Sequence, residues 1–276
     1  MTNTSARPLL GYFGHHKCGS TWFQAICGEV CRELKLRFQI VYHAEHVGND
    51  LSAFVRSKEL DFISYNNAHY AQVQALGPMK GFHVVRDPRD ICVSAYFSHR
   101  YSHKVEGWPE MQRHRRRLEE VSEEEGILLE MDWLQRHFDE MRSWPDSVDG
   151  ILQLKMEDIT AEPFGQMLRV FQYLGVVDDD RISSPFAPQR LPAERVLGII
   201  WEHDFSRKTR GRALGQEDVT SHYRKGTPGD WKNHFRPTHV DYFKERYNDL
   251  LVQYGYEPDA GWDLRVPDEA AVSSAM

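Results

Sequence analysis

The stretch GYFGHHKCGSTWFQ, residues 11–24, decides the fold that the sequence predicts. It closes a short apolar run at 9–14, passes through a turn that holds Lys17 and Gly19, and opens a segment with apolar residues at helical spacing. In a strand, turn and helix of this kind, the first N–H groups of the helix point at one spot, and the helix dipole favours an anion there. The stretch therefore predicts a P-loop-like phosphate-binding loop.

Two details of this loop leave alternatives open. The lysine stands before the glycine, so the loop departs from the G-x-x-x-x-G-K-[ST] pattern of ATP-binding loops. The hydroxyls of Ser20 and Thr21 could bind an anion, but either could also serve as an ordinary helix N-cap.

Strands and helices alternate along the rest of the chain. Further strands are expected at 38–43, 61–66, 81–87 and 151–158, and helices at 20–36, 88–97, 127–141, 164–175 and 241–255. This order predicts an α/β fold with a central parallel sheet flanked by helices. We expect a single domain over 1–276, with a core at about 8–256 and an extended or frayed tail at 257–276. The charge-rich segment at 101–126 is expected to be a solvated face.

The composition argues against several classes of partner. A net charge of −7 provides no global positive excess for binding nucleic acid. The polar N-terminus lacks a signal peptide's apolar segment, and no run of about 18 apolar residues occurs, so we expect no membrane insertion. The four cysteines show neither a disulfide framework nor a zinc spacing, which predicts buried or bystander thiols in the cytoplasm.

Two more stretches carry charge that suits phosphate. In RDPRDICVS, 86–94, Arg86 leaves a buried strand and Ser94 follows on a helix, so both can contact one phosphate. The alternative is a local ion-pair network among the arginines and aspartates of this stretch. In SHYRKGTPGDWKNHF, 221–235, Arg224 and Lys225 precede Gly226 on a flexible loop, for which a basic surface turn is the alternative.

The three stretches together resemble the sulfotransferase family, which uses 3′-phosphoadenosine 5′-phosphosulfate (PAPS). HKCGSTW is similar to the family's PKSGTTW, RDPRDICVS to R-N-P-x-D-x-x-x-S, and RKGTPGDWK to RKGxxGDWK, in the same order. The resemblance implies transfer of a sulfuryl group from PAPS to a hydroxyl of a small-molecule or lipid-like acceptor. It implies no metal, because basic clusters supply the positive charge.

The resemblance also implies roles for individual residues. It places Lys17, Cys18, Gly19, Ser20 and Thr21 at the 5′-phosphosulfate, with Lys17 as the catalytic cation at the leaving oxygen, and Trp22 at the adenine. It places at the 3′-phosphate the residues Arg86, Ser94, Arg224, Lys225 and Gly226. The segment 211–218 is expected to form a flap that leads into the third stretch.

The base that accepts the acceptor's proton is where the resemblance weakens. Many family members carry K-T-H where this chain has Ser64, Tyr65 and Asn66, and an asparagine cannot act as a base. Two residues are rival candidates for the base. His69 stands three residues after Asn66. Glu45 follows the first helix and the second strand, where other branches of the family use a glutamate. Met156 likewise stands where a tyrosine often contacts the adenine.

Two other functions stay open at this point. A P-loop nucleotide kinase would leave the 3′-phosphate clusters unexplained, and a non-catalytic nucleotide-binding module would explain the missing base. The acceptor and the oligomeric state are not indicated by the sequence, although aromatic residues near the expected site suit an apolar alcohol or phenol.

Overall fold

The computed structural model describes residues 8–178 and 189–264. Contacts divide the chain into two compact units, Met1–Arg86 with Gln135–Pro228, and Asp87–Leu134 with Gly229–Met276. The divisions fall inside the second and third stretches, so each contributes residues to both units.

The first unit is built on a parallel sheet. In the described residues the strands are β1 Leu9–Phe13, β2 Phe38–Val41, β3 Phe62–Tyr65, β4 Met79–Val85 and β5 Ile151–Lys155. Their order is β2-β3-β1-β4-β5, and all neighbours pair in parallel. Of the strands that follow β1, β2 and β3 lie on one side of it, and β4 and β5 lie on the other, so the loops after β1 and β4 meet at the switch point where such sheets bind ligands.

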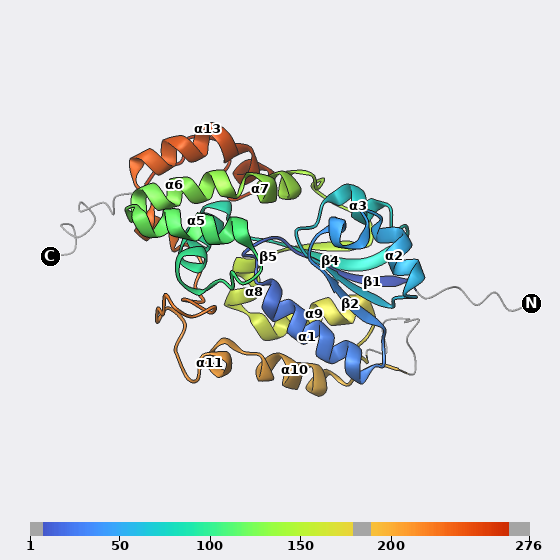
Figure 1. The fold of residues 1–276 in the computed structure, drawn as a ribbon. Helices are drawn as coiled ribbons and strands as arrows, with labels where there is room; N and C mark the ends of the chain where they lie inside the picture. Colours follow the sequence, from blue (N-terminus) through green and yellow to red (C-terminus); the bar gives the residue numbers. More distant parts are fainter. Residues whose placement is uncertain (1–7, 179–188, 265–276) are drawn as a thin grey trace, which may run out of the picture. The chain divides into compact units, whose positions relative to one another are not determined.

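Helices cover both faces of this sheet (Figure 1). The elements are α1 Ser20–Glu33, η1 Ala44–Val47, α2 Leu51–Ser57, α3 Tyr70–Gln74, α7 Gln135–Arg142, α8 Met156–Ala161, α9 Pro163–Leu174, α10 Ala193–Glu202 and α11 Phe205–Lys208. Leu10 and Tyr12 point to the face covered by α1, α9 and α10, whereas Phe13 and Ile63 point to the face covered by α2 and α3. This alternation along the strands is what gives the sheet a core on each side.

The second unit is helical in the part that the structure describes. Its elements are α4 Pro88–Phe97, the π-helical η2 Ser98–Ser102, α5 Pro109–Glu120, α6 Glu123–Trp133, α12 Trp231–His234 and α13 Pro237–Gln253. Arg89 lies between the rings of Trp231 and Trp262, at 4.0 and 4.6 Å from their centroids. It also forms ion pairs with Asp87 at 2.7 Å and with Glu257 at 2.6 Å.

The predicted α/β fold with a parallel sheet flanked by helices is confirmed. The helix predicted at 127–141 is wrong in its extent, because the chain turns at Leu134 and forms α6 and α7. The strand predicted at 151–158 ends at Lys155, where α8 begins. The segment 101–126 is more than a solvated face, since Met111 and Leu118 are buried.

The predicted tail begins inside the packed chain. Trp262 is only 8% exposed and contacts Trp231 and Phe243, so packing extends past residue 257. Residues 265–276 lie outside the described part. Among the described residues, no helix combines the length and apolar character needed to cross a bilayer.

Candidate active site

The loop between β1 and α1 has the backbone of an anion site. Lys17 and Gly19 adopt left-handed conformations, with φ of 61° and 74°, and Gly19 is the N-cap of α1. No side chain caps this helix, and its first turn has no acidic residue. The hydroxyl of Ser20 donates instead to the carbonyl of His15 at 3.3 Å. The alternative of an ordinary N-cap by Ser20 or Thr21 is therefore wrong, and the first N–H groups of α1 have no side-chain cap.

Arg86 connects the end of β4 to this loop. Its Nη1 donates to the carbonyl of Lys17 at 3.1 Å. Cys18, between Lys17 and Gly19, is fully buried, and burial raises the pKa of its thiol to about 12 although Arg86 acts in the opposite direction. Cys18 is thus a structural residue of the loop and an unreactive thiol.

The third stretch reaches the same loop. His222 Nε2 lies 3.0 Å from the hydroxyl of Thr21. The segment 211–226 is folded around Arg212, whose guanidinium donates to the carbonyls of Gln216, Tyr223 and Arg224. This segment therefore brings His222 to the amino end of α1.

Within that segment, Arg224 pairs with Glu217. Gly226 has a φ of 73°, and a Cβ there would lie 2.8 Å from the side chains of Leu214 and Phe205. Lys225 contributes its carbonyl, which accepts from Gly215 at 2.9 Å. Glycine at 226 is thus required both by the backbone and by the packing of the segment.

Two contacts hold the indole ring of Trp22 in place. Its Nε1 donates to the carbonyl of His203 at 2.9 Å, and its ring stands edge-on to Phe23 at 5.0 Å. Met156 lies beneath the loop, where its Cε would be 2.9 Å from a Cβ on Gly19. These contacts fix both side chains beside the loop, and the expected role of Trp22 at the adenine stays a prediction.

The second unit contains the rest of the second stretch. Asp87 and Arg89 form the ion-pair network that was the alternative interpretation, whereas Arg86 has the separate partner described above. Asp90 is buried, and its two oxygens accept from the backbone N–H groups of Gly229 at 2.7 Å and Trp231 at 2.9 Å. Asp90 therefore fixes the start of α12. Ser94 lies in the middle of α4, and its predicted contact with phosphate stays a prediction.

The three residues discussed in connection with the base, Asn66, Glu45 and His69, each make contacts with other protein groups. Asn66 is 3% exposed, and its side-chain amide donates to the carbonyl of Val41 at 3.5 Å. Glu45 has a half-exposed side chain that forms an ion pair with Arg136 at 2.5 Å. The pKa of Glu45 lies below its usual range, because a hydrogen bond from its own backbone N–H and the Arg136 guanidinium both favour the charged form. His69 is exposed and caps α3 by accepting from the N–H of Ala71 at 3.3 Å.

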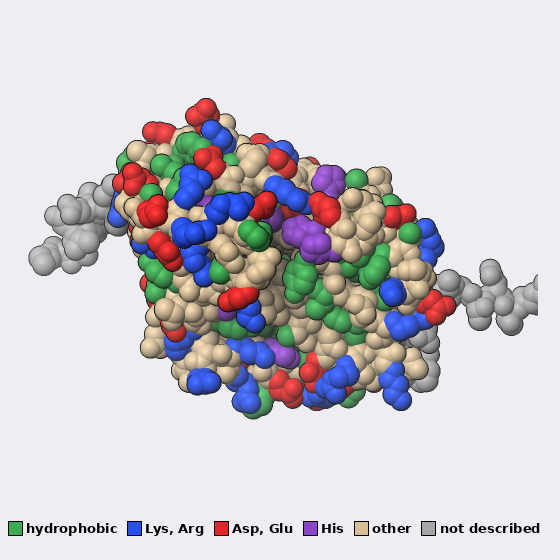
Figure 2. All heavy atoms as spheres, in the orientation of Figure 1, with side chains coloured by type: hydrophobic (Ala, Val, Ile, Leu, Met, Phe, Trp, Pro, Cys, Tyr) green, Lys and Arg blue, Asp and Glu red, His purple; other side chains and the backbone are tan. Residues whose placement is uncertain are grey.

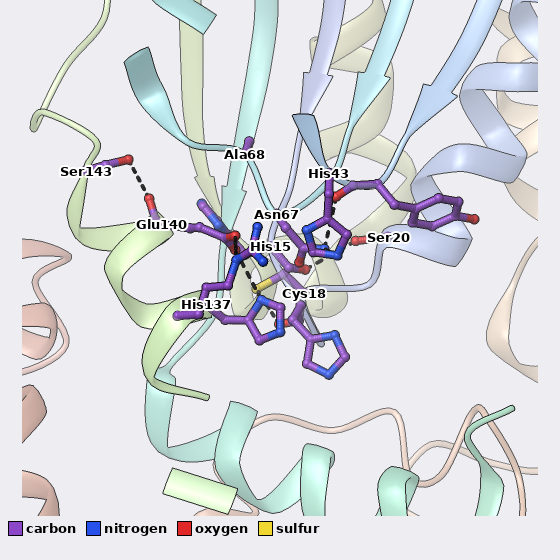
Figure 3. Close-up of polar contacts among 12 residues, drawn as sticks. His15, Cys18, Ser20, His43, Asn67, Ala68, His137, Glu140 and Ser143 are labelled. Carbon is purple, nitrogen blue, oxygen red and sulfur yellow. Dashed lines mark hydrogen bonds and ion pairs between the residues drawn. The ribbon is translucent and has the colours of Figure 1, made fainter. Parts of the chain in front are cut away.

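A cluster that the sequence did not single out lies at the carboxyl ends of the strands, next to the anion loop (Figure 3). His137 Nδ1 lies 3.1 Å from Glu140 Oε2, and the ring of His137 is stacked on that of His16 at 4.7 Å. The ring of His43 follows at 6.4 Å from His137. We call His16, His43, His137 and Glu140 the histidine cluster. Figure 2 shows histidine side chains gathered on the face in view, beside acidic and basic side chains.

Asn67 fixes the ring of His43. Its Nδ2 donates to the carbonyl of Tyr42 and to His43 Nε2, both at 3.1 Å, so the proton of the neutral ring is on Nδ1. That Nδ1 is buried and has no hydrogen-bond partner among the described residues. Burial lowers the pKa of His43, although Glu140 acts in the opposite direction. A buried donor without a partner costs about 1–3 kcal/mol, so its place beside the anion loop favours a polar ligand there.

Within the second unit, one group of described side chains has the ligand types that could hold a metal. His99, His114 and Glu130 of the second unit have ligand atoms within 4.8 Å of one another. All three are buried, and Glu130 already accepts from His99 Nδ1 at 2.9 Å and from His114 Nε2 at 2.8 Å. Hydrogen bonds therefore account for this arrangement without an ion.

Comparison with known proteins identifies the family. A family model described as the sulfotransferase domain matches residues 13–255. The chain is similar to Sulfotransferase 1C2 of Homo sapiens, at 28% identity over 61% of this chain and 53% of that protein. It is also similar to a flavonol sulfotransferase-like protein of Flaveria bidentis, at 33% identity over 33% of this chain and 29% of that protein. The chain thus matches about half or less of the length of these relatives.

Solved structures show the same fold. Mouse sulfotransferase SULT7A1 complexed with PAP superimposes with a TM-score of 0.57 at 18% identity, covering 88% of this chain and 84% of that one. Retinol dehydratase in complex with androsterone and the inactive cofactor PAP gives a TM-score of 0.55 at 16% identity, covering 96% and 85%.

Proposed function

Because the chain belongs to the sulfotransferase domain family, we propose that it transfers the sulfuryl group of PAPS to a hydroxyl of a small-molecule or lipid-like acceptor. The observation that carries the proposal is the uncapped amino end of α1, where Arg86 contacts the carbonyl of Lys17 and His222 of the third stretch contacts the hydroxyl of Thr21. A single phosphate would need only the loop. Two further basic segments at the loop suit a donor that carries a second phosphate.

In this proposal the loop holds the 5′-phosphosulfate. The backbone N–H groups at Gly19, Ser20 and Thr21 and the side chain of Lys17 surround it, while Cys18 supplies backbone only. Trp22 stacks on the adenine. The 3′-phosphate is bound by the residues Arg86, Ser94, Arg224, Lys225 and Gly226.

The chemistry is an in-line displacement at sulfur. The acceptor oxygen forms a bond to sulfur while the bond from sulfur to the 5′-phosphate oxygen breaks, and the electron pair stays on that oxygen. Lys17 stabilises the developing charge, so its contribution belongs to the transition state. A basic and polar site suffices for this step, and we propose that no metal takes part.

The direct test of function uses PAPS carrying labelled sulfur with a cell extract, followed by mass analysis of labelled products. Labelled product from the wild type and its loss in Lys17→Ala would support the proposal. We expect Lys17→Ala to lower the single-turnover rate about 10²-fold or more with a modest loss of PAP affinity. Lys58→Ala, on the exposed end of α2, is the matched control.

The test of the donor uses adenosine 3′,5′-bisphosphate (PAP) and AMP. Arg224→Ala should weaken PAP binding far more than AMP binding, because only PAP has the 3′-phosphate. Calorimetry on both nucleotides, with the exposed Arg116→Ala as control, measures the difference. Equal losses for PAP and AMP would exclude a 3′-phosphate contact by Arg224.

The two alternative functions, a nucleotide kinase and a non-catalytic nucleotide-binding module, differ in the support that they have. The family match places the chain among sulfotransferases and gives no support to a nucleotide kinase. A non-catalytic module would bind PAP tightly and turn over no acceptor in the labelled-PAPS assay. The four cysteines are free and buried, which supports our proposal of a cytoplasmic location.

A further inference from the structure

The side chains that the sequence offered as the base, Glu45 and His69, make hydrogen bonds or ion pairs that do not suit this role. Glu45 is paired with Arg136, which favours its ionised form but makes it a weak proton acceptor. The Nδ1 of His69 accepts from a backbone N–H as the cap of α3. Asn66 has no basic atom. A different group must therefore accept the proton of the acceptor hydroxyl.

We propose that His137, oriented by Glu140, is the general base of sulfuryl transfer; this inference rests on the proposed function. Nδ1 of His137 donates to Glu140 Oε2 at 3.1 Å, which leaves the lone pair of the neutral ring on Nε2. Glu140 is 6% exposed, and its other oxygen accepts from Arg136 Nε at 3.2 Å. Both oxygens of the carboxylate are thus engaged, and it holds the imidazole in the tautomer that a base requires.

The dyad lies beside the anion loop. The ring of His137 is stacked on that of His16 with an interplanar angle of 17°, and Lys17 follows His16 in the chain. His43, whose buried Nδ1–H has no partner among the described residues, contributes a donor to the same cluster. The base at His137 and the donor at His43 therefore lie in one cluster beside the anion loop, where the proposed function places the sulfuryl group (Figure 3).

The proton balance of the step is simple. As the acceptor oxygen bonds to sulfur, its proton moves to Nε2 of His137, and the resulting imidazolium is stabilised by the Glu140 carboxylate. PAP leaves with the electron pair of the broken sulfur–oxygen bond. The imidazolium then returns its proton to solvent, and the dyad is restored.

The test compares acceptors of different acidity in single-turnover transfer from labelled PAPS: 4-nitrophenol, phenol, benzyl alcohol and water. His137→Asn should lose about 10²–10⁴-fold with benzyl alcohol and water, and much less with 4-nitrophenol, which ionises without help. PAP affinity, measured by calorimetry, should stay within about twofold of the wild type. Glu45→Gln and His69→Asn are the matched comparisons and should show no such dependence on acceptor acidity.

Glu140→Gln tests the positioning role. The glutamine amide can donate to Nδ1, which moves the ring proton to Nε2 and removes the base, so the same dependence on acceptor acidity should appear. A loss of equal size with every acceptor, or an acidity-dependent loss in Glu45→Gln or His69→Asn instead, would overturn the assignment to His137. If the wild type consumes no PAPS with any of these acceptors or with extract, the proposed function fails, and this inference fails with it.

Discussion

The carboxylate of Asp90 in the second stretch accepts a hydrogen bond from the backbone N–H of Trp231 in the third, at 2.9 Å. A second bond, from the N–H of Gly229 at 2.7 Å, occupies its other oxygen. Asp90 is 1% exposed, so both bonds are made by a buried side chain. The aspartate of R-D-P-R-D and the G-D-W of the third stretch are thus one structural unit, although about 140 residues separate them.

We expect Asp90→Asn to lower the free energy of unfolding by about 2 kcal/mol, because an amide offers one acceptor where the carboxylate offers two. Asp90→Ala should cost more, since both N–H groups then lack a partner. Urea unfolding of both variants measures the loss, with the exposed Asp241→Asn on α13 as control. Unchanged unfolding of Asp90→Ala would contradict the role given to these bonds.

Gly19 is constrained in two separable ways. Its φ of 74° disfavours any side chain, and a Cβ would meet the Cε of Met156 at 2.9 Å. We expect Gly19→Ala to destabilise the protein by about 1–3 kcal/mol and to weaken PAP binding, because the loop must move to relieve the contact.

The double variant Gly19→Ala with Met156→Ala separates the two causes. Removing the methionine side chain should recover about 1 kcal/mol of the loss, and the backbone cost should remain. Strictly additive losses in unfolding and PAP calorimetry would show that Met156 does not press on residue 19.

Much of the fold could be predicted because local patterns determine it. The strands β1 to β4 follow short, mostly apolar runs and the helices α1 and α9 follow the period of 3.6 residues, and Gly175 ends α9 with a φ of 77°. The break at Leu134 was not predictable from periodicity, because apolar residues continue at helical spacing across it. The break coincides with the boundary at which the chain passes from the second unit to the first.

The candidate site likewise has one part that local sequence predicts and one part that depends on the tertiary fold. Lys17 and Gly19 stand in one contiguous stretch, so the anion loop could be predicted from local sequence. His16 and His137 are 121 residues apart, and only the return of the chain after the sheet's fourth strand places their rings in contact. The one local signal was the pair His137 and Glu140, three apart on an amphipathic helix.

The ion pair of Arg224 with Glu217 gives a third prediction. If Arg224 binds the 3′-phosphate, Glu217 competes with that phosphate for the guanidinium. Glu217→Gln should then tighten PAP binding about two- to tenfold and leave AMP binding unchanged, since the pair is partly exposed and weak. Weaker PAP binding in Glu217→Gln, measured by calorimetry, would mean that the pair shapes the 211–226 segment instead.

Glu130 gives a prediction about acid stability. Burial alone would raise the pKa of this carboxyl, but His99 and His114 outweigh burial and lower the pKa from 4.5 to about 2. A carboxyl with a depressed folded-state pKa stabilises the protein above its unfolded pKa, and this contribution is lost as the pH falls from 4.5 towards 2. The unfolding free energy of the wild type should therefore exceed that of Glu130→Gln by roughly 3 kcal/mol at pH 7, and the difference should shrink steadily below pH 4.5. Urea unfolding between pH 7 and pH 3 measures the difference at pH 7 and its decrease at lower pH, with the exposed Glu119→Gln on α5 as control. A difference that stays constant over this range would show that Glu130 is not held ionised by the two histidines.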